Sequence, residues 1–182
     1  MLYLFLADGF EETEALVPLD LIRRAGIPVL TVGVTGESVA GAHHICVRSD
    51  IPMEDVDLSD CAGVILPGGM PGTENLYADT RVRDAVTFCA ENNKLIACIC
   101  AAPIIPGRMG LLQGKQAVCF PGFEAELTGR IASDESVVRD GSLITAKGAG
   151  CVFPFAAKII ESLDRKETAD SVIRSIQYTD LT

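Results

Sequence analysis

The chain has 182 residues, 48% of them hydrophobic, which is typical of about one folded domain with a buried core and excludes a disordered chain. Its 15 basic and 25 acidic side chains give a net charge of −10, and a field of that sign repels nucleic acid and anionic lipid. We therefore expect neither a nucleic-acid partner nor a membrane partner.

The chain begins with the apolar run Met1–Leu6, and acidic residues follow from Asp8. This run is too short for a secretion signal or a membrane span, which needs ~20 residues, and it predicts a first buried strand. We therefore expect a cytoplasmic protein.

Similar short apolar runs recur along the chain, each ended by glycine or proline. They predict strands at Leu2–Leu6, Pro28–Val32, Gly63–Leu66, Lys94–Ile99, Gln116–Cys119 and Leu143–Ala146. Because these runs lack polar alternation, they suit a parallel sheet that is covered on both faces. A two-residue turn at Asp140-Gly141 predicts a hairpin between Ser136–Arg139 and Ser142–Thr145.

Helical periodicity fills most of the intervals between these strands. It predicts helices at Glu11–Ala25, Arg81–Asn92, Ala101–Leu112 and Cys151–Leu163, and a terminal amphipathic helix at Arg165–Tyr178. Pro18 lies inside the first of these, so we expect a kink or a helix in two parts.

Alternating strands and helices predict an α/β fold, a three-layer sandwich with a mostly parallel sheet and a small β-hairpin. No internal repeat or flexible linker interrupts the pattern, so we predict a single domain over residues 1–182. Ligands in such sheets bind beyond the carboxyl ends of the strands. Three joints there are candidates for the site: Ala7-Asp8-Gly9, Leu66-Pro67-Gly68-Gly69 and Cys98-Ile99-Cys100-Ala101.

The chain has seven cysteines, and Cys100 differs from the others in its position. It lies where a predicted strand turns sharply into a predicted helix, an arrangement that resembles a nucleophile elbow. The N-terminus of that helix favours the thiolate form of the cysteine. From spacing alone, an inert buried cysteine explains the pattern equally well.

The other cysteines lie in or beside apolar runs, and we predict that they are small core side chains. They are Cys46, Cys61, Cys89, Cys98, Cys119 and Cys151. Their spacing matches neither a redox C-x-x-C motif nor a zinc site, so we expect no bound metal.

Glu14 is the carboxylate most relevant to Cys100, since the first predicted helix brings it toward the same edge of the sheet. An ionised carboxylate raises the pKa of a neighbouring thiol, so a functional Glu14 has to be protonated and donate a hydrogen bond. The alternative is that Glu11, Glu12 and Glu14 form a solvated acidic first turn.

Two further pairs of residues have both a structural and a functional interpretation. Gly68-Gly69 forms either a simple tight turn or a source of N–H donors for a developing oxyanion near Cys100. His43 and His44 point to opposite faces if they lie in a strand, so at most one reaches a site. No histidine follows Cys100, which disfavours a Cys–His dyad.

The sequence resembles the DJ-one (ThiJ/PfpI) superfamily, specifically a bacterial branch often labelled as thiazole-monophosphate biosynthesis proteins. The segments that carry the resemblance, in order, are Ala7–Glu14, Arg23–Gly26, Leu66–Gly69, Ile99–Pro103, Cys119–Glu124 and Ile144–Gly150. Each segment alone is a weak signal. Six of them in order, covering nearly the whole chain, make the resemblance specific.

The resemblance implies a flavodoxin-like, Rossmann-type sandwich that forms homodimers and needs no cofactor. It implies that Cys100 is the reactive, oxidisable cysteine and that protonated Glu14 hydrogen-bonds its thiol. It also implies that the backbone amides of Gly69 and Ala101 flank the thiol, while His43 matches only a variable polar position.

Three departures from the family pattern limit what the resemblance implies. Phe120 stands where some relatives have a histidine near the cysteine, and Ala101 stands where the protease-like branch has one. The common R-G-P-G-T segment appears as Lys147-Gly148-Ala149-Gly150-Cys151. Peptidase activity is therefore disfavoured, and a thiamine-pathway role rests on the label alone.

The leading hypothesis is an enzyme that uses Cys100 in glyoxalase or deglycase chemistry on reactive dicarbonyls or glycation adducts. Glu14 moves the proton, and the substrate oxygen is held by the amides of Gly69 and Ala101, with Gly68 beside them. The alternative is a redox sensor or stress-protection module in which Cys100 is oxidised to sulfinate.

Overall fold

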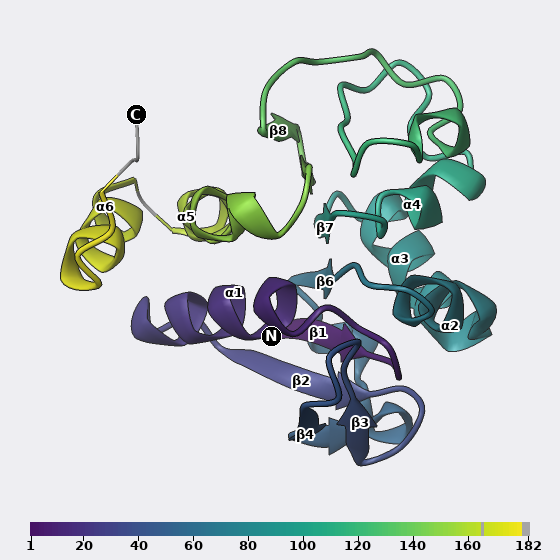
Figure 1. Ribbon diagram of the computed structural model, residues 1–182, viewed down its shortest axis with the longest axis horizontal. Coiled ribbons are helices and arrows are strands. Elements are labelled where there is room, and N and C mark those ends of the chain that lie inside the picture. The colour runs from purple at the N-terminus through teal and green to yellow at the C-terminus, as the bar shows by residue number, and fades with distance from the viewer. Residues whose placement is uncertain (165, 180–182) are drawn as a thin grey trace.

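The computed structural model describes residues 1–164 and 166–179, and its centre is a seven-stranded sheet (Figure 1). The strand order is β5-β2-β1-β6-β7-β9-β8, and every neighbouring pair is parallel except β8 with β9. These strands are β1 (Leu2–Leu6), β2 (Val29–Gly33), β5 (Ile51–Pro52), β6 (Gly63–Leu66), β7 (Leu95–Ile99), β8 (Val137–Asp140) and β9 (Leu143–Ala146).

Helices cover both faces of the sheet (Figure 1). One face carries α1 (Glu12–Arg24), α5 (Val152–Leu163) and α6 (Lys166–Ser175). The other carries α2 (Gly72–Ala78), α3 (Thr80–Glu91) and α4 (Ile104–Arg108). Short 3-10 turns lie at Met53–Asp55, Leu58–Asp60, Glu124–Glu126 and Ala149–Cys151.

Two hydrophobic cores form because successive side chains of a strand point to opposite faces. In β1, Leu2, Leu4 and Leu6 join the core under α1 and α5. Tyr3 and Phe5 join the core under α2 and α3. The α/β class, the three layers and the mostly parallel sheet predicted from the sequence are therefore confirmed.

Two predicted elements are wrong in part or in whole. Gln116–Cys119 forms no strand of the main sheet, because β9 is paired with β7 on one side and with β8 on the other. The segment makes an isolated bridge from Gln116 to Ile131, and the Val118 N–H donates to Thr145 Oγ1 at 3.0 Å. The helix predicted at Ala101–Leu112 is only the five-residue α4, since Pro106 lacks an N–H and Gly110 has a φ of +73°.

Other predicted elements differ in their limits or continuity. The C-terminal hairpin is confirmed, but its turn lies at Gly141-Ser142, one residue later than predicted. Helix α1 runs unbroken past Pro18 rather than in two parts. The terminal helix is confirmed as α6, although Arg165, its predicted first residue, lies outside the described residues.

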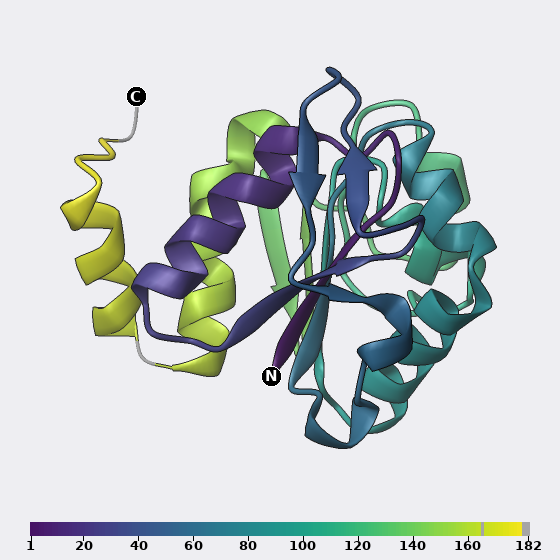
Figure 2. The same cartoon turned by 90° about the horizontal axis from the view of Figure 1, so that it is seen from below.

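A second, two-stranded antiparallel sheet, which was not predicted from the sequence, pairs β3 (Ser38–Ala40) with β4 (Cys46–Arg48). Figure 2 shows this hairpin beside the start of α1, at the carboxyl end of the main sheet. Helix α2 and the short strand β5 were likewise not predicted. Among the described residues, no helix has the length and apolar character needed to cross a membrane.

Candidate active site

Cys100 lies directly after β7, at the carboxyl edge of the sheet, and has a φ of +64°. A residue other than glycine adopts this left-handed backbone conformation at a cost of about 1–3 kcal/mol, so the surrounding structure has to hold Cys100 in it. The Cys100 N–H donates to the Ala146 carbonyl at 2.9 Å, and its own carbonyl accepts from the Phe120 N–H at 2.8 Å. The backbone of Cys100 is therefore fixed on both sides.

The joint after β7 is a turn rather than the start of a helix. Helix α4 begins only at Ile104 and has five residues, so its dipole has little effect on the Cys100 sulfur. The expectation that a helix N-terminus favours the thiolate is therefore not met. Donors close to the sulfur come instead from the backbone N–H groups of Gly69 and Ala101, both hydrogen-bonded to it.

Glu14 reaches the same point from the first turn of α1 and is only 1% exposed. Its Oε2 accepts the Gly68 N–H at 2.9 Å, and its carboxyl forms a side-chain hydrogen bond with the Cys100 thiol. The structure thus brings together two groups that are 86 positions apart in the sequence, one from the first turn of α1 and one from the end of β7.

The titration of this pair is dominated by burial. Burial raises the pKa of Glu14 to about 7, against the opposing hydrogen bonds from Cys100 and Gly68. Burial, followed by the charge of Glu14, raises the pKa of Cys100 to about 12, against the hydrogen bonds from Ala101 and Gly69. Between these two pKa values, the carboxyl and the thiol together hold one proton.

The glycine turn after β6 allows this close approach. A Cβ atom at Gly68 would lie 2.6 Å from both the Cys100 Cβ and Glu14 Oε2, closer than real carbon atoms approach. Gly69 has a φ of +88°, which a residue with a side chain rarely adopts. The Gly68 N–H is engaged by Glu14, so it positions the carboxyl rather than facing a substrate oxygen as the sequence analysis expected.

His43 lies in a separate polar group beside this site. Its Nδ1 is 2.9 Å from Glu12 Oε2 and 3.6 Å from Glu11 Oε2, and in the described part of the chain this is the group in which three metal-ligating side chains meet. Glu12 is buried, and its hydrogen bonds to the side chain and backbone of His43 lower its pKa to about 2. His43 therefore meets Glu12 and Glu11 rather than Cys100.

The remaining cysteines differ in exposure more than predicted. Cys61, Cys89, Cys98 and Cys119 are buried, whereas Cys46 is exposed and Cys151 is half-buried. Cys46 is exposed because it lies in the small hairpin outside the main core, a feature that apolar neighbours in the sequence do not reveal.

Phe120 and Met70 lie next to residues of the site and are exposed by 47% and 46%. The Phe120 ring approaches Gly148, where an added Cβ would lie 3.2 Å from it. Lys147, in the same turn, donates through Nζ to the Asp134 carbonyl at 2.8 Å. Phe120 and Met70 therefore present exposed apolar side chains beside the site.

The chain is similar to known proteins over nearly its whole length. Residues 1–162 match the family model described as the DJ-1/PfpI family. Protein dj-1beta of Drosophila melanogaster is 34% identical over 174 residues, which cover 94% of this chain and 93% of the fly protein. A Caenorhabditis elegans protein named glutathione-independent glyoxalase DJR-1.2 is 29% identical, over 96% of this chain and 94% of its own.

Solved structures extend the comparison to the fold. The structure titled Toxoplasma gondii DJ-1, oxidized, superposes with a TM-score of 0.93 at 30% identity and covers 98% of both chains. Because nearly the whole chain matches in sequence and in structure, we conclude that it belongs to the DJ-1/PfpI family.

Proposed function

We propose that this protein is a cofactor-independent glyoxalase or deglycase that acts on reactive dicarbonyls, or on their early adducts, through Cys100. The observation that carries the proposal is the arrangement around one sulfur: a hydrogen-bonded carboxyl with a pKa near neutrality and two backbone N–H donors. The name of the Caenorhabditis elegans relative supports the same class of reaction.

In this proposal, the Cys100 sulfur adds to the aldehyde carbon of methylglyoxal and forms a hemithioacetal. Glu14 accepts the thiol proton as the C–S bond forms and passes it to the carbonyl oxygen. The N–H groups of Gly69 and Ala101, which hydrogen-bond the sulfur, stabilise the negative charge as it moves from sulfur to oxygen.

The second stage moves a proton within the bound substrate. Glu14 removes it from the former aldehyde carbon and returns it to the neighbouring carbon through an enediol, which leaves a thioester on Cys100. Water then hydrolyses the thioester to lactate and frees the thiol. The net reaction adds one water and involves no net oxidation, so it needs neither an oxidant nor a reductant.

A glyoxalase assay of purified Cys100→Ser tests this proposal, with Cys46→Ser as the matched control because Cys46 is exposed on the β3–β4 hairpin. We expect turnover of methylglyoxal to lactate to fall at least about 1,000-fold in Cys100→Ser, since a weaker nucleophile replaces the thiol. We expect Cys46→Ser to keep full turnover. Activity that survives in Cys100→Ser excludes the mechanism.

A second candidate is a redox sensor in which peroxide oxidises Cys100 to sulfinate. The same donors favour it, since protonated Glu14 and the two N–H groups can bind sulfinate oxygens. Peroxide titration followed by intact mass and peptide mapping separates the two candidates. The sensor requires that Cys100 takes up oxygen before any other cysteine does.

The family resemblance also leads us to propose a homodimer. Light scattering behind size-exclusion chromatography measures the mass directly, and we expect about twice the mass of one 19.3 kDa chain. A concentration-independent mass of a single chain contradicts this part of the proposal.

A further inference from the structure

Two buried cysteines lie in contact at the opposite end of the sheet from Cys100. Cys61 lies just before β6, and Cys89 lies in the last turns of α3. Their sulfur atoms are 3.8 Å apart, and in the described part of the chain this is the one pair of cysteine sulfurs in hydrogen-bond contact. The candidate active site uses neither residue.

The surrounding backbone holds the two residues in place. The Cys61 thiol also lies 3.6 Å from the Gly63 carbonyl, at the start of β6. The Cys89 carbonyl accepts the Lys94 N–H at 2.8 Å, which ties the end of α3 to the start of β7. Because β6 and β7 are neighbouring strands, both cysteines are anchored to the same rigid part of the sheet.

The two thiols are not equivalent. The contact with the Cys89 thiol, with the positive charges of the N-terminus and Lys94, lowers the pKa of Cys61. The same contact and burial raise the pKa of Cys89. Of the two thiols, Cys61 is therefore the one that loses its proton more readily.

We propose that Cys61 and Cys89 form a second redox site, an oxidisable dithiol that closes to an intrachain disulfide when a hydroperoxide reaches it. The site is independent of the reaction at Cys100. It rests on the 3.8 Å contact between the two sulfurs and on the fixed backbone on either side of them.

The chemistry balances with hydrogen peroxide as the oxidant. The Cys61 thiolate attacks one peroxide oxygen, the O–O bond breaks, and the products are a Cys61 sulfenic acid and hydroxide, which takes up a proton to become water. The Cys89 sulfur then attacks the Cys61 sulfur, the S–O bond breaks, and the leaving hydroxide takes the Cys89 proton. Two thiols and one peroxide thus give one disulfide and two waters.

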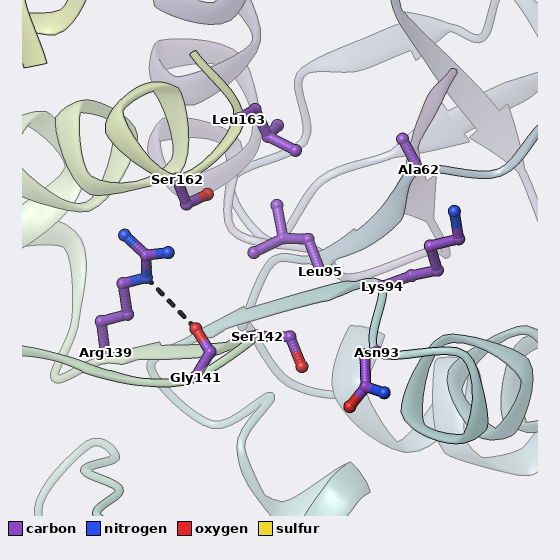
Figure 3. A pocket seen from close by; sticks show the side chains of 9 residues that line it. All are labelled: Ala62, Asn93, Lys94, Leu95, Arg139, Gly141, Ser142, Ser162 and Leu163. Carbon is purple, nitrogen blue, oxygen red and sulfur yellow. Dashed lines mark hydrogen bonds between the residues drawn. The ribbon is translucent and has the colours of Figure 1, made fainter. Parts of the chain in front are cut away.

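Cys61 is the more accessible of the two thiols. Cys61 is 3% exposed, whereas Cys89 has no exposed surface. A pocket of about 330 Å³ lies at the amino ends of the central strands (Figure 3). Ala62 and Lys94 are among the residues that line it. Figure 3 shows these two residues on one side of the pocket and Arg139 on the other. The pocket brings solvent to the residue that follows Cys61.

Formation of the bond requires the two sulfurs to move closer together. A disulfide has its sulfurs about 2.05 Å apart, so rotation of the two side chains has to close the remaining gap. The partners are separated by 28 positions in the sequence, so the bond would connect the end of α3 to the strand entry beside it. A crosslink of that span restricts the unfolded chain and raises the unfolding temperature.

The test is a hydrogen peroxide titration of the folded full-length chain, followed by thiol blocking and peptide mapping without reduction. We expect a linked peptide pair that contains Cys61 and Cys89, lighter by two hydrogen atoms and released by dithiothreitol. Cys98 is equally buried but has no sulfur partner, so it serves as the internal control and should stay a free thiol.

Variants separate this site from Cys100. In Cys100→Ser the linked pair still forms, and the oxidised protein melts several degrees higher than the reduced protein. Cys89→Ser abolishes both the linked pair and the shift. The proposal is overturned if Cys61 and Cys89 both remain free when Cys100 is fully oxidised, or if they become linked only after the chain is unfolded in urea.

Discussion

At the scale of single residues, the site depends on one carboxyl and one thiol that share a buried environment. The Glu14 carboxyl is held by the Gly68 N–H and by the Cys100 thiol, and its pKa lies near 7 because of burial. A carboxyl with this pKa is half-ionised at neutral pH, so it can both accept and return a proton within a catalytic cycle. The thiol alone has no such property, because its own pKa is raised to about 12.

Glu14→Gln is expected to change how the alkylation rate of Cys100 depends on pH. In the unmodified protein, we expect the rate to rise about tenfold per pH unit below an inflection near pH 7, where Glu14 loses its proton and can accept that of the thiol. Glutamine cannot accept that proton, so the inflection should disappear. Iodoacetamide labelling of Cys100 across this pH range, read by mass spectrometry, measures the profile.

Asp20→Asn is the control for this experiment, because Asp20 lies on the same helix but pairs with Arg24 at the surface. It should leave the inflection where it is. A profile that is identical in Glu14→Gln and in the unmodified protein means that the carboxyl and the thiol do not exchange a proton.

At the scale of secondary-structure elements, one buried carboxylate helps to attach the small β3–β4 hairpin to the main fold, in addition to backbone bonds such as that from the Ala42 N–H to the Phe10 carbonyl, 2.8 Å. Glu12 Oε1 accepts the N–H groups of His43 at 2.8 Å and of Ile45 at 3.4 Å, and Oε2 pairs with the His43 ring. These contacts fix the hairpin loop against the start of α1. They also hold α1 in the position from which Glu14 reaches Cys100, since the two glutamates share its first turn.

Glu12→Gln should loosen the hairpin without unfolding the sheet. Hydrogen bonds to a charged group contribute about 1.5–3 kcal/mol, so we expect a loss of about 1–2 kcal/mol in the free energy of unfolding at neutral pH. Amide hydrogen exchange at His43 and Ile45 should become faster, while exchange in β6 and β7 should not. Asp20→Asn, on the same helix but paired with Arg24 at the surface, is the matched control.

The way in which the strands pair explains which of them could be predicted from the sequence. The strands that lead to Gly68 and Cys100 are predictable because they are uninterrupted apolar runs that end in glycine or a turn. Strand β3, with one buried residue in three, has no such run. Gln116–Cys119 has the apolar composition of a strand, but β9 is already paired with β7 and β8. Only the assembled sheet reveals this pairing.

At the site itself, residue types predict the participants, and the assembled geometry determines what each one does. The sequence predicts Gly68 as a donor to substrate, whereas in the fold its N–H binds Glu14. The positive φ of Cys100 and the contact between Cys61 and Cys89 have no local signature, since each depends on strands that are distant in the sequence.

At the scale of the whole molecule, Glu14 makes the stability of the fold depend on pH. Its pKa rises from 4.5, its ordinary value, to about 7 in the folded protein, so between these values the folded state binds more protons than the unfolded state. The free energy of unfolding therefore falls as pH rises through this range. Glu12 has the opposite effect, because its pKa of about 2 makes its contribution present above its ordinary pKa and lost in acid.

Urea unfolding at a series of pH values measures this effect. From the size of the pKa change, we expect Glu14 to lower the free energy of unfolding by up to about 3 kcal/mol between about pH 5 and pH 8. Glu14→Gln should flatten the curve over this range and make the protein more stable at the alkaline end. A variant that is less stable than the unmodified protein at about pH 8 contradicts the assignment.

The left-handed backbone at Cys100 implies a trade-off between stability and chemistry. Glycine adopts a φ of +64° without steric strain, so Cys100→Gly should relieve part of the roughly 1–3 kcal/mol that a side chain costs there. It would also remove the sulfur that Glu14 and the two amides surround. The fold thus keeps a thiol at a position where its backbone alone would favour no side chain.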